Sequence, residues 1–290
     1  MPDTPTPRGP GNRLDEPPGP DGPSGQDGPS MPDERPVLDE RPVLDERSVL
    51  GRSMRILHAF GAEDRGVGLM ELTRRTGLPK ATVHRMAQDL VTAGLLAVGD
   101  RGYRLGRGLF ELGMLAAPER SLIEVAVPFM QDLFLRTDET VHLGIREGTE
   151  VVYISKVGGH RQAPTPTRLG GRMPLYCTAI GKALLAHAPR STVRQVLSGP
   201  LERRTPRTLV QPGPLGRQLD RIVAEGVAYE YEECLPGITC VAAPVLDPDD
   251  RPLAAISVTG PSTRFRPERH QASVRAAAAG TASILARRGG

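Results

Sequence analysis

The sequence lacks several features that define large classes of protein. It contains no tryptophan, and aromatic residues make up only 3% of its 290 residues. It has no run of about 18 apolar residues, which excludes a transmembrane helix. No apolar stretch follows the first charged residues, which excludes a secretory signal peptide. We therefore expect a soluble, cytoplasmic chain with no membrane partner.

Cysteine is scarce as well. The three cysteines, Cys177, Cys234 and Cys240, are an odd number in a chain of this length and argue against a disulfide framework. The last two are not part of a Cys-x-x-Cys pair and have no pair of histidines nearby. We predict no metal site and no cofactor.

The sequence also shows no catalytic motif. Gly181-Lys182 lacks the upstream glycine and the following Ser or Thr of a phosphate-binding loop. A cysteine nucleophile needs a histidine partner, and the sequence alone cannot place one beside any of the three thiols. We predict no catalytic residues.

The N-terminal segment differs from the rest in composition. Its first thirty residues are rich in Pro, Gly and Asp, and a six-residue repeat follows: DERPVL from Asp33, DERPVL from Asp39 and DERSVL from Asp45. Such a segment buries too little apolar surface to offset its ordering entropy, so we expect residues 1–47 to form a disordered tail. A docking motif built on the Val-Leu pairs is the alternative, and Met31 offers a second translation start.

The segment that follows has the pattern of a winged helix-turn-helix. Leu69 and Leu72 fall on one stripe of a short helix, and Gly77 tolerates the left-handed backbone of a helix end. Pro79 suits the start of the next helix. The buried face of that second helix is predicted to consist of Val83, Met86, Ala87 and Leu90.

The outward positions of the second helix suit DNA. They are Lys80, Ala81, Thr82, His84, Arg85 and Gln88. Most of them carry hydrogen-bond donors that phosphates and major-groove base edges accept. A hairpin from Leu95 to Leu105 follows, and its Arg101 and Arg104 are predicted to lie along the DNA backbone as a wing.

A packed helical pair with a solvated arginine face, including Arg74 and Arg75, is the alternative for the same segment. Charge favours DNA binding, because residues 48–115 hold ten Lys/Arg and six Asp/Glu, a net of +4. Residues 1–47 hold five Arg and eleven acids, a net of −6. A basic module beside an acidic tail is typical of nucleic-acid binding.

Three further segments complete the predicted organisation. The DNA-binding domain spans 48–106 and opens with a helix whose apolar stripe includes Leu50, Met54 and Leu57. A linker helix spans 107–120. In the domain at 121–290, helices are expected over 121–135, 178–188, 218–225 and 267–288, and strands over 141–145, 151–157, 237–246 and 253–259. These elements lack a strict βαβ alternation, which favours an α+β fold with an antiparallel sheet.

Five motifs resemble, in order and spacing, those of bacterial IclR-type transcriptional regulators: GLPKATVHRM, YRLGRGLFELG, LGGRMPLYCTAIGKALLA, YEYEECLPGITCVAAPV and AAISVTGP. The resemblance covers the chain from about Val49 to its C-terminus. It implies a winged helix-turn-helix, a linker helix and a GAF/profilin-like effector domain. It also implies a homodimer or homotetramer on a palindromic operator of double-stranded DNA. We expect a ligand-responsive regulator, a repressor, without enzymatic activity.

The resemblance implies an effector pocket between the sheet and the helix that follows the Gly-Gly segment. By position its residues are Gly170, Gly171, Met173, Ala179, Ile180, Glu230, Cys240, Ser257 and Thr259. Helix N-terminal amides near Thr178 favour an anion, and alternation puts Ser257 and Thr259 on one strand face. The expected ligand is a small carboxylate metabolite. Two ordinary strand hydroxyls beside a core are the alternative for Ser257 and Thr259.

Three positions depart from the family pattern. Ala81 replaces a common Ser and removes a phosphate contact, and Cys177 replaces a more frequent Ala. Ile180 is bulkier than the residue of members that bind two- and three-carbon acids, which disfavours glyoxylate or pyruvate. The rival interpretation is a hydrolase or transferase fused to a DNA-binding module, for which the sequence supplies no nucleophile and base.

Overall fold

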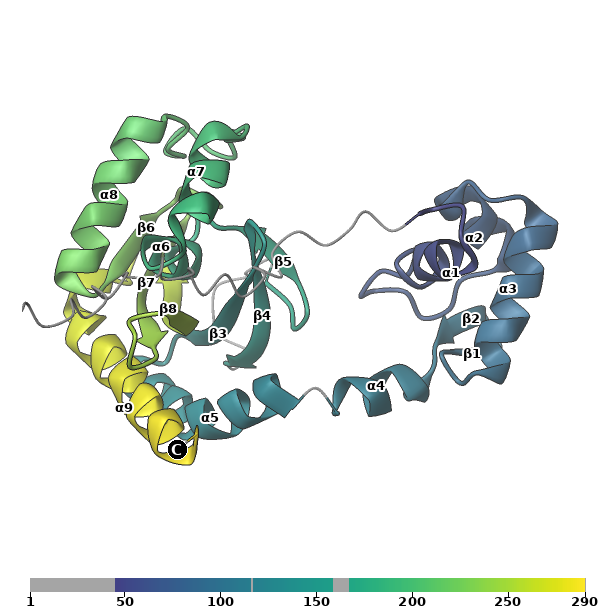
Figure 1. Ribbon diagram of the computed structural model, residues 1–290, viewed down its shortest axis with the longest axis horizontal. Helices are drawn as coiled ribbons and strands as arrows, with labels where there is room; N and C mark the ends of the chain where they lie inside the picture. The colour runs from purple at the N-terminus through teal and green to yellow at the C-terminus, as the bar shows by residue number, and fades with distance from the viewer. Residues whose placement is uncertain (1–44, 116, 159–166, 290) are drawn as a thin grey trace, which may run out of the picture. The chain divides into compact units, whose positions relative to one another are not determined.

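The computed structural model describes residues 45–115, 117–158 and 167–289 (Figure 1). The predicted tail lies outside the described residues except for its last three, 45–47. No described helix combines the length and the apolar character needed to cross a membrane.

The N-terminal module has the order helix, helix, helix, hairpin. Its elements are α1 (Val49–Leu57), α2 (Leu69–Thr76), α3 (Lys80–Thr92), β1 (Leu96–Gly99) and β2 (Gly102–Leu105). Ser48 caps α1 by accepting a hydrogen bond from the amide of Gly51. Gly77 ends α2 with φ at 64°, a left-handed conformation that glycine adopts without strain. The predicted winged helix-turn-helix is confirmed.

The core of this module follows the predicted pattern in α3 but not in α1. Val83, Met86, Ala87 and Leu90 are all buried. In α1, Ile56 is fully buried, whereas Leu50 is 60% exposed. The predicted α1 stripe was therefore wrong at Leu50. Apolar residues surround this short helix, so spacing alone could not select the face that contacts α3.

Two helices follow the hairpin. They are α4 (Arg107–Gly113) and α5 (Ala117–Thr137). The single linker helix expected over 107–120 is thus divided, and α5 begins before Pro118. A proline in the first helical turn removes no intrahelical hydrogen bond, so it does not prevent a helix from starting there.

The C-terminal half is built on one six-stranded antiparallel sheet with the order β5-β4-β3-β8-β7-β6. Its strands are β3 (Thr140–Glu147), β4 (Glu150–Val157), β5 (Arg172–Pro174), β6 (Ala228–Tyr231), β7 (Ile238–Leu246) and β8 (Pro252–Pro261). Every neighbouring pair is antiparallel. The predicted α+β class is confirmed.

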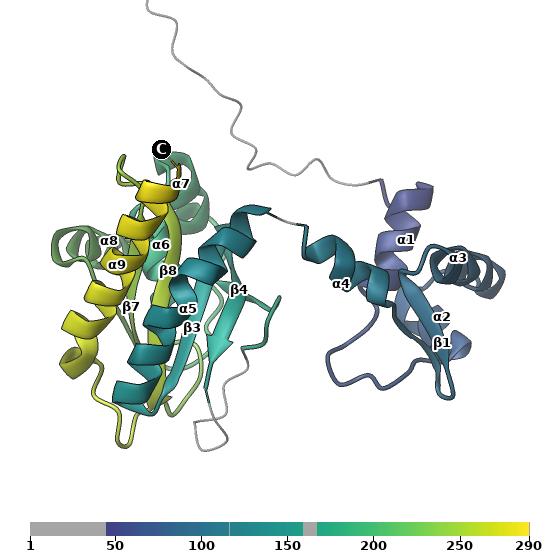
Figure 2. The ribbon, with the colours of Figure 1, turned by 90° about the horizontal axis from the view of Figure 1, so that it is seen from below.

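Helices cover both faces of the sheet. On one face α5 packs beside α9 (Gln271–Gly289), which follows a short 3-10 turn, Pro267–His270 (Figure 2). The other face carries α6 (Ala179–Ala186), α7 (Arg190–Ser198) and α8 (Pro212–Glu225). Each face has its own hydrophobic cluster.

Some of these elements were not expected from the sequence. They are α7, β5 and β6, and α8 begins at Pro212 rather than at residue 218. Pro212, Gly213 and Pro214 resemble a loop, but proline at the first helical position is compatible with a helix. The four residues of β6 are a strand because they pair with β7.

Side chains alternate between the two faces of β8, and those on one face leave space for a cavity. Ile256 and Val258 join the cluster under α5 and α9. Residues of opposite parity, Ala255, Ser257 and Thr259, face α6. These side chains are small, so the sheet and α6 leave space between them.

Candidate functional site

One face of α3 is exposed throughout its length. Lys80, Ala81, His84, Arg85 and Gln88 are exposed, and Thr82 is half-buried. All but Thr82 line a shallow groove that also includes Leu69 and Asp89. The opposite face is the buried one, so core packing holds this polar row outward.

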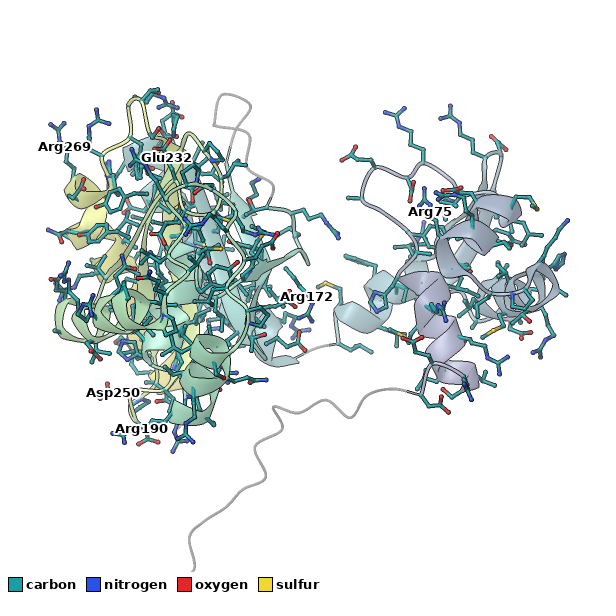
Figure 3. The ribbon with its side chains drawn as sticks, turned by 90° about the horizontal axis from the view of Figure 1, so that it is seen from above. Arg75, Arg172, Arg190, Glu232, Asp250 and Arg269 are labelled. Carbon is teal, nitrogen blue, oxygen red and sulfur yellow. The ribbon has the colours of Figure 1, made fainter. Side chains whose placement is uncertain are left out.

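The charged groups of the module fall into two sets. Arg75, labelled in Figure 3, binds Asp64 at 2.5 Å and Glu71 at 2.7 Å. Arg74 binds Glu71 at 2.6 Å. The hydrogen bonds from Arg74 and Arg75 hold the pKa of Glu71 at about 2. Among the described residues, Lys80 and Arg85 have no ion pair and no side-chain hydrogen bond. Arg74 and Arg75 therefore fit the alternative interpretation, in which they belong to an arginine face that binds no DNA. Lys80 and Arg85 are available to a ligand.

The hairpin is fixed to the rest of the module. The amide of Val67 donates to the Tyr103 carbonyl at 2.8 Å, and the amide of Tyr103 donates back at 2.9 Å. Gln88 on α3 also donates to the Tyr103 hydroxyl at 3.4 Å. Arg101 and Arg104 are exposed on this hairpin, and neither has an ion-pair partner in the described part of the chain.

A cavity lies between the sheet and the start of α6. Its lining consists of His142, Tyr153, Thr167, Met173, Thr178, Ala179, Ile180, Glu230, Cys234, Leu235, Ile238, Cys240, Ser257 and Thr259. Strand register assembles the floor, because Glu230 pairs with Cys240, and Cys240 pairs with Thr259. Ser257 similarly lies opposite His142.

The cavity unites seven of the nine residues expected from the family resemblance. They are Met173, Ala179, Ile180, Glu230, Cys240, Ser257 and Thr259. Gly170 and Gly171 are not part of the lining. Their backbones bind that of Tyr153, because the Gly170 amide donates to the Tyr153 carbonyl at 2.8 Å and the Tyr153 amide donates to the Gly171 carbonyl at 3.1 Å. The Gly-Gly segment therefore positions a lining residue.

Six lining residues were not expected: His142, Tyr153, Thr167, Cys234, Leu235 and Ile238. The sequence predicted strands at β3 and β4, but not the register of β3 against β4 and β8. His142 and Ser257 are 115 positions apart in the chain and become neighbours only through strand pairing. The histidine and the tyrosine also make an edge-on ring contact, with centroids 5.2 Å apart.

Some polar groups of the lining have a hydrogen-bond partner among the described residues, and others do not. His142 Nε2 lies 2.7 Å from Thr167 Oγ1, and burial lowers the pKa of His142 to about 3, so its ring is neutral. The Thr259 hydroxyl donates to Cys240 Sγ at 3.2 Å. The hydroxyls of Ser257 and Tyr153 have no hydrogen-bond partner among the residues described.

Among the described lining residues, Glu230 alone carries a carboxyl group. It is 1% exposed, and its Oε1 accepts from the amides of Glu233 at 2.7 Å and Cys234 at 3.1 Å. Burial raises its pKa to about 7. Behind it, fully buried Lys182 binds Glu233 at 2.5 Å and Gln218 at 3.0 Å. The positive charge of Lys182 is therefore engaged outside the lining.

The start of α6 supplies the positive wall of the cavity. Thr178 accepts from the Gly181 amide at 3.0 Å, while the amides of Ala179 and Ile180 are first-turn donors without intrahelical acceptors. A Cβ on Gly181 would lie 2.3 Å from the Leu175 carbonyl oxygen, so only glycine permits this tight approach. Helix amides suit an anionic group here.

The described residues do not form a metal centre. No group of three or more His, Cys, Asp or Glu residues within the described ranges can hold a metal ion. Cys240 is a poor nucleophile because burial raises the pKa of its thiol well above the usual range. The lining chemistry suits recognition of a small molecule.

Comparison with known proteins gives the same result for both halves of the chain. The family description "Bacterial transcriptional regulator IclR C-terminal" matches residues 114–286, and "IclR helix-turn-helix domain" matches residues 49–98. The chain is 38% identical over 219 residues to the HTH-type transcriptional regulator KdgR of Escherichia coli K12, which covers 74% of this chain and 83% of that protein. It is 29% identical over 225 residues to the transcriptional repressor IclR of the same organism, covering 76% and 82%.

Two solved structures share the architecture. A crystal structure of an IclR homolog from Microbacterium hydrocarbonoxydans, complexed with 4-hydroxybenzoate, matches with a TM-score of 0.78 at 30% identity, covering 84% of this chain and 100% of that one. The Thermotoga maritima IclR matches with a TM-score of 0.69 at 30% identity, covering 82% and 98%.

Proposed function

Since this chain belongs to the IclR family of bacterial transcriptional regulators, we propose that it is a repressor controlled by a small hydroxylated or aromatic carboxylate. The family consists of DNA-binding regulators with an effector domain and is not an enzyme family. Repression is supported by the relative named as a transcriptional repressor.

One observation carries the ligand proposal. Ser257 and Tyr153, with hydroxyls that have no partner among the described residues, line the same cavity as the first residues of α6, and no lysine or arginine is among its described lining residues. A carboxylate is matched by the amides and by neutral donors rather than by a cation. The apolar walls of Met173 and Ile180 accommodate a hydrocarbon or ring.

Glu230 narrows the ligand class. In its ionised form it repels a second carboxylate, and in its protonated form it donates one hydrogen bond. A ligand hydroxyl can serve both forms, because it accepts from the acid and donates to the carboxylate. This favours a hydroxy acid over a dicarboxylate, and a homologous structure was solved with 4-hydroxybenzoate.

DNA recognition is assigned to α3 and the hairpin. The contact residues proposed are Lys80, Ala81, Thr82, His84, Arg85, Gln88, Arg101 and Arg104. Lys80 and Arg85, which have no ion-pair partner among the described residues, provide charge for phosphates or guanine edges. Two copies of the helix on a palindromic operator require a dimer, in which each copy reads one half-site.

Exposed apolar residues on α4 and directly after it support this dimer. Phe110 is 68% exposed, and Leu112 and Leu115 are 60% and 75% exposed. Large apolar side chains clustered on one short segment favour association. A second copy of the chain is the proposed occupant.

The test combines ligand titration with operator binding. We expect 4-hydroxybenzoate to bind in a calorimetric titration and to weaken a gel shift on DNA from upstream of the gene. Benzoate, which lacks the hydroxyl, and 4-hydroxybenzyl alcohol, which lacks the carboxylate, should bind more weakly. The ligand class is wrong if the alcohol binds as well as the acid, and the regulatory role is wrong if a bound acid leaves the gel shift unchanged.

A further inference from the structure

Lys182 lies next to the effector site, but the proposed function gives it no role. It belongs to the Gly181-Lys182 pair that does not form a phosphate-binding loop. We propose that Lys182 is a positioning residue, which holds the turn after β6 and thereby fixes Glu230 for a ligand hydroxyl. This inference rests on the proposed function, because it concerns the carboxyl group to which the ligand hydroxyl is assigned.

Lys182 on α6 is fully buried, and its ammonium group has partners on two other parts of the fold. The Nζ atom donates to Glu233 Oε1 at 2.5 Å and to Gln218 Oε1 on α8 at 3.0 Å. Removing a charge from water is costly unless its partners lie in a well-defined geometry. The ammonium group therefore constrains the side chain of Glu233 relative to α6 and α8.

The carboxylate of Glu233 depends on this contact. Glu233 is 4% exposed, and its Oε2 has no hydrogen-bond partner among the described residues. Lys182 therefore anchors this carboxylate through Oε1. Because Glu233 lies in the turn between β6 and β7, the anchor acts on that turn.

The same turn holds the carboxyl group of Glu230. The amides of Glu233 and Cys234 donate to Glu230 Oε1 at 2.7 and 3.1 Å. Glu232, which precedes both amides, has φ at 57°, a left-handed conformation that a residue with a side chain adopts only where its surroundings enforce it. The two amides thus require anchors outside the turn to remain directed at Glu230.

Two threonines are the competing anchors. The Thr205 hydroxyl donates to the Glu232 carbonyl at 2.6 Å, and the Thr208 hydroxyl donates to the Glu233 carbonyl at 2.7 Å. They bind the backbone from the segment between α7 and α8. Lys182 differs from them because it joins the turn to α6, whose first residues line the cavity.

The expected consequence is specific to the ligand hydroxyl. Without the Lys182 contact, the turn would no longer hold the Glu230 carboxyl group in one orientation, and the hydrogen bond to a ligand hydroxyl would weaken. The contacts of the ligand carboxylate and ring would remain. A pair that only stabilised the fold would instead change the affinity for ligands with and without the hydroxyl alike.

Two substitutions of Glu233 separate the hydrogen bond from the charge. Glu233→Gln keeps an oxygen acceptor for Lys182 and Glu233→Met removes it, while both leave the ammonium group without a counter-charge. Calorimetric titration gives the ratio of the affinities for 4-hydroxybenzoate and benzoate. We expect Glu233→Gln to keep the wild-type ratio, and Glu233→Met to lower it about fivefold with the affinity for benzoate unchanged.

Amide hydrogen exchange, measured by NMR, tests the same contact without a ligand. The amides at positions 233 and 234 should exchange about fivefold faster in Glu233→Met than in Glu233→Gln, because they no longer remain directed at Glu230. A double variant, Lys182→Met with Glu233→Met, replaces the buried pair by apolar side chains, which is often neutral for stability. It should show the same faster exchange and keep the fold even where the single variants do not.

Operator binding without ligand shows that each variant is folded, since neither residue lies in the DNA-binding module. Equal exchange in the two single variants would overturn the proposal, and so would wild-type exchange in the double variant, because the threonines would then suffice. An equal loss of affinity for both ligands in Glu233→Met would also overturn it. If neither ligand binds the wild type, the proposed function fails, and the exchange rates still decide whether Lys182 positions the turn that holds Glu230.

Discussion

At the scale of residues, side chains of the same type differ in whether they have an ion-pair or hydrogen-bond partner within the chain. Arg74 and Arg75 are engaged with acids on their own module, whereas Arg85 is free among the described residues. The same distinction holds in the cavity, where the Thr259 hydroxyl donates to Cys240 and the Ser257 hydroxyl has no partner among the described residues. Free groups have no intramolecular interaction to lose on binding, so we expect them to contribute most to recognition.

Arg85→Ala should weaken operator binding and reduce the slope of log affinity against log salt by ~1 if Arg85 contacts a phosphate. A gel shift at several salt concentrations measures both. Arg136→Ala is the matched control, because Arg136 is an exposed arginine on α5 paired with Asp132 at 2.7 Å. Affinity and salt slope equal to those of the control would remove Arg85 from the interface.

The double variant Ser257→Ala, Tyr153→Phe should bind the effector about five- to 150-fold more weakly, since each neutral hydrogen bond contributes ~0.5–1.5 kcal/mol. Binding to the operator without ligand should be unchanged. Thr239→Val is the control, because the Thr239 hydroxyl is buried and unpaired but lies outside the cavity lining. Calorimetric titration measures the effector affinity of each variant. A double variant that binds the effector as tightly as the wild type would place the ligand elsewhere. Thr259→Val would not test ligand binding alone, because it would also remove the hydrogen bond from the Thr259 hydroxyl to Cys240.

Glu230 should make stability depend on pH. Its pKa rises from 4.5 to about 7 on folding, so the folded state binds the extra proton between these values. Stability from this group is present below pH 4.5 and is lost as the pH rises through about 7, a change on the order of 3 kcal/mol. His142, whose pKa falls to about 3, has the opposite effect, because it stabilises above pH 6.5 and loses this as the pH falls.

Comparison of the wild type with Glu230→Gln isolates this effect, because His142, Lys182, Glu233, Cys234 and Cys240 remain in both proteins. Urea unfolding at pH 5, 6, 7 and 8 should show the wild type losing stability relative to the variant as the pH rises. Parallel curves for the two proteins would mean that Glu230 keeps an ordinary pKa.

At the scale of elements, the boundary of α1 extends into the last copy of the repeat. The Asp45 carbonyl accepts from the amide of Ser48 at 2.9 Å and from its hydroxyl at 2.7 Å. Glu46 forms an exposed ion pair with Arg55 at 3.4 Å. The α1 cap therefore includes residues that composition alone assigned to the tail.

Truncation should reveal this boundary. A chain that begins at Asp45 should keep the melting temperature and the DNA footprint of the full chain. A chain that begins at Arg47 loses the carbonyl of Asp45 and the carboxylate of Glu46, and its melting temperature should fall by a few degrees for ~1 kcal/mol lost. Equal melting temperatures for the two truncated chains would show that these contacts contribute nothing. Loss of the footprint in the chain from Asp45 would assign a role in DNA binding to residues 1–44.

At the scale of the whole molecule, the proposed function depends on how copies associate. An operator with two half-sites requires two recognition helices held at a fixed spacing. The apolar residues of α4 adjoin the hairpin in sequence, so contacts between copies at this position would set that spacing. Ligand binding in the effector domain could then control DNA affinity through the dimer.

Leu112→Asp should shift the sedimentation coefficient toward that of a monomer and weaken operator binding, because a charge buried in an apolar contact is costly. Leu135→Asp provides the control, since Leu135 is 81% exposed on α5 and outside the proposed contact. Unchanged sedimentation of the Leu112 variant would exclude α4 from the interface between copies.

The sequence by itself determined the local features of this protein. The spacing of Val83, Met86, Ala87 and Leu90 defined the buried face of α3, and therefore its exposed polar face. Alternation along β8 put Ser257 and Thr259 on one face. These inferences succeeded because helix and strand periodicity depend on residues only a few positions apart.

Only the tertiary structure decided which distant residues meet. His142 and Tyr153 reach the cavity through strand register, and Arg75 forms an ion pair with Asp64. Burial then sets the pKa of Glu230 and of His142. Register, pairing and burial arise from contacts between residues far apart in the chain, and periodicity carries no information about them.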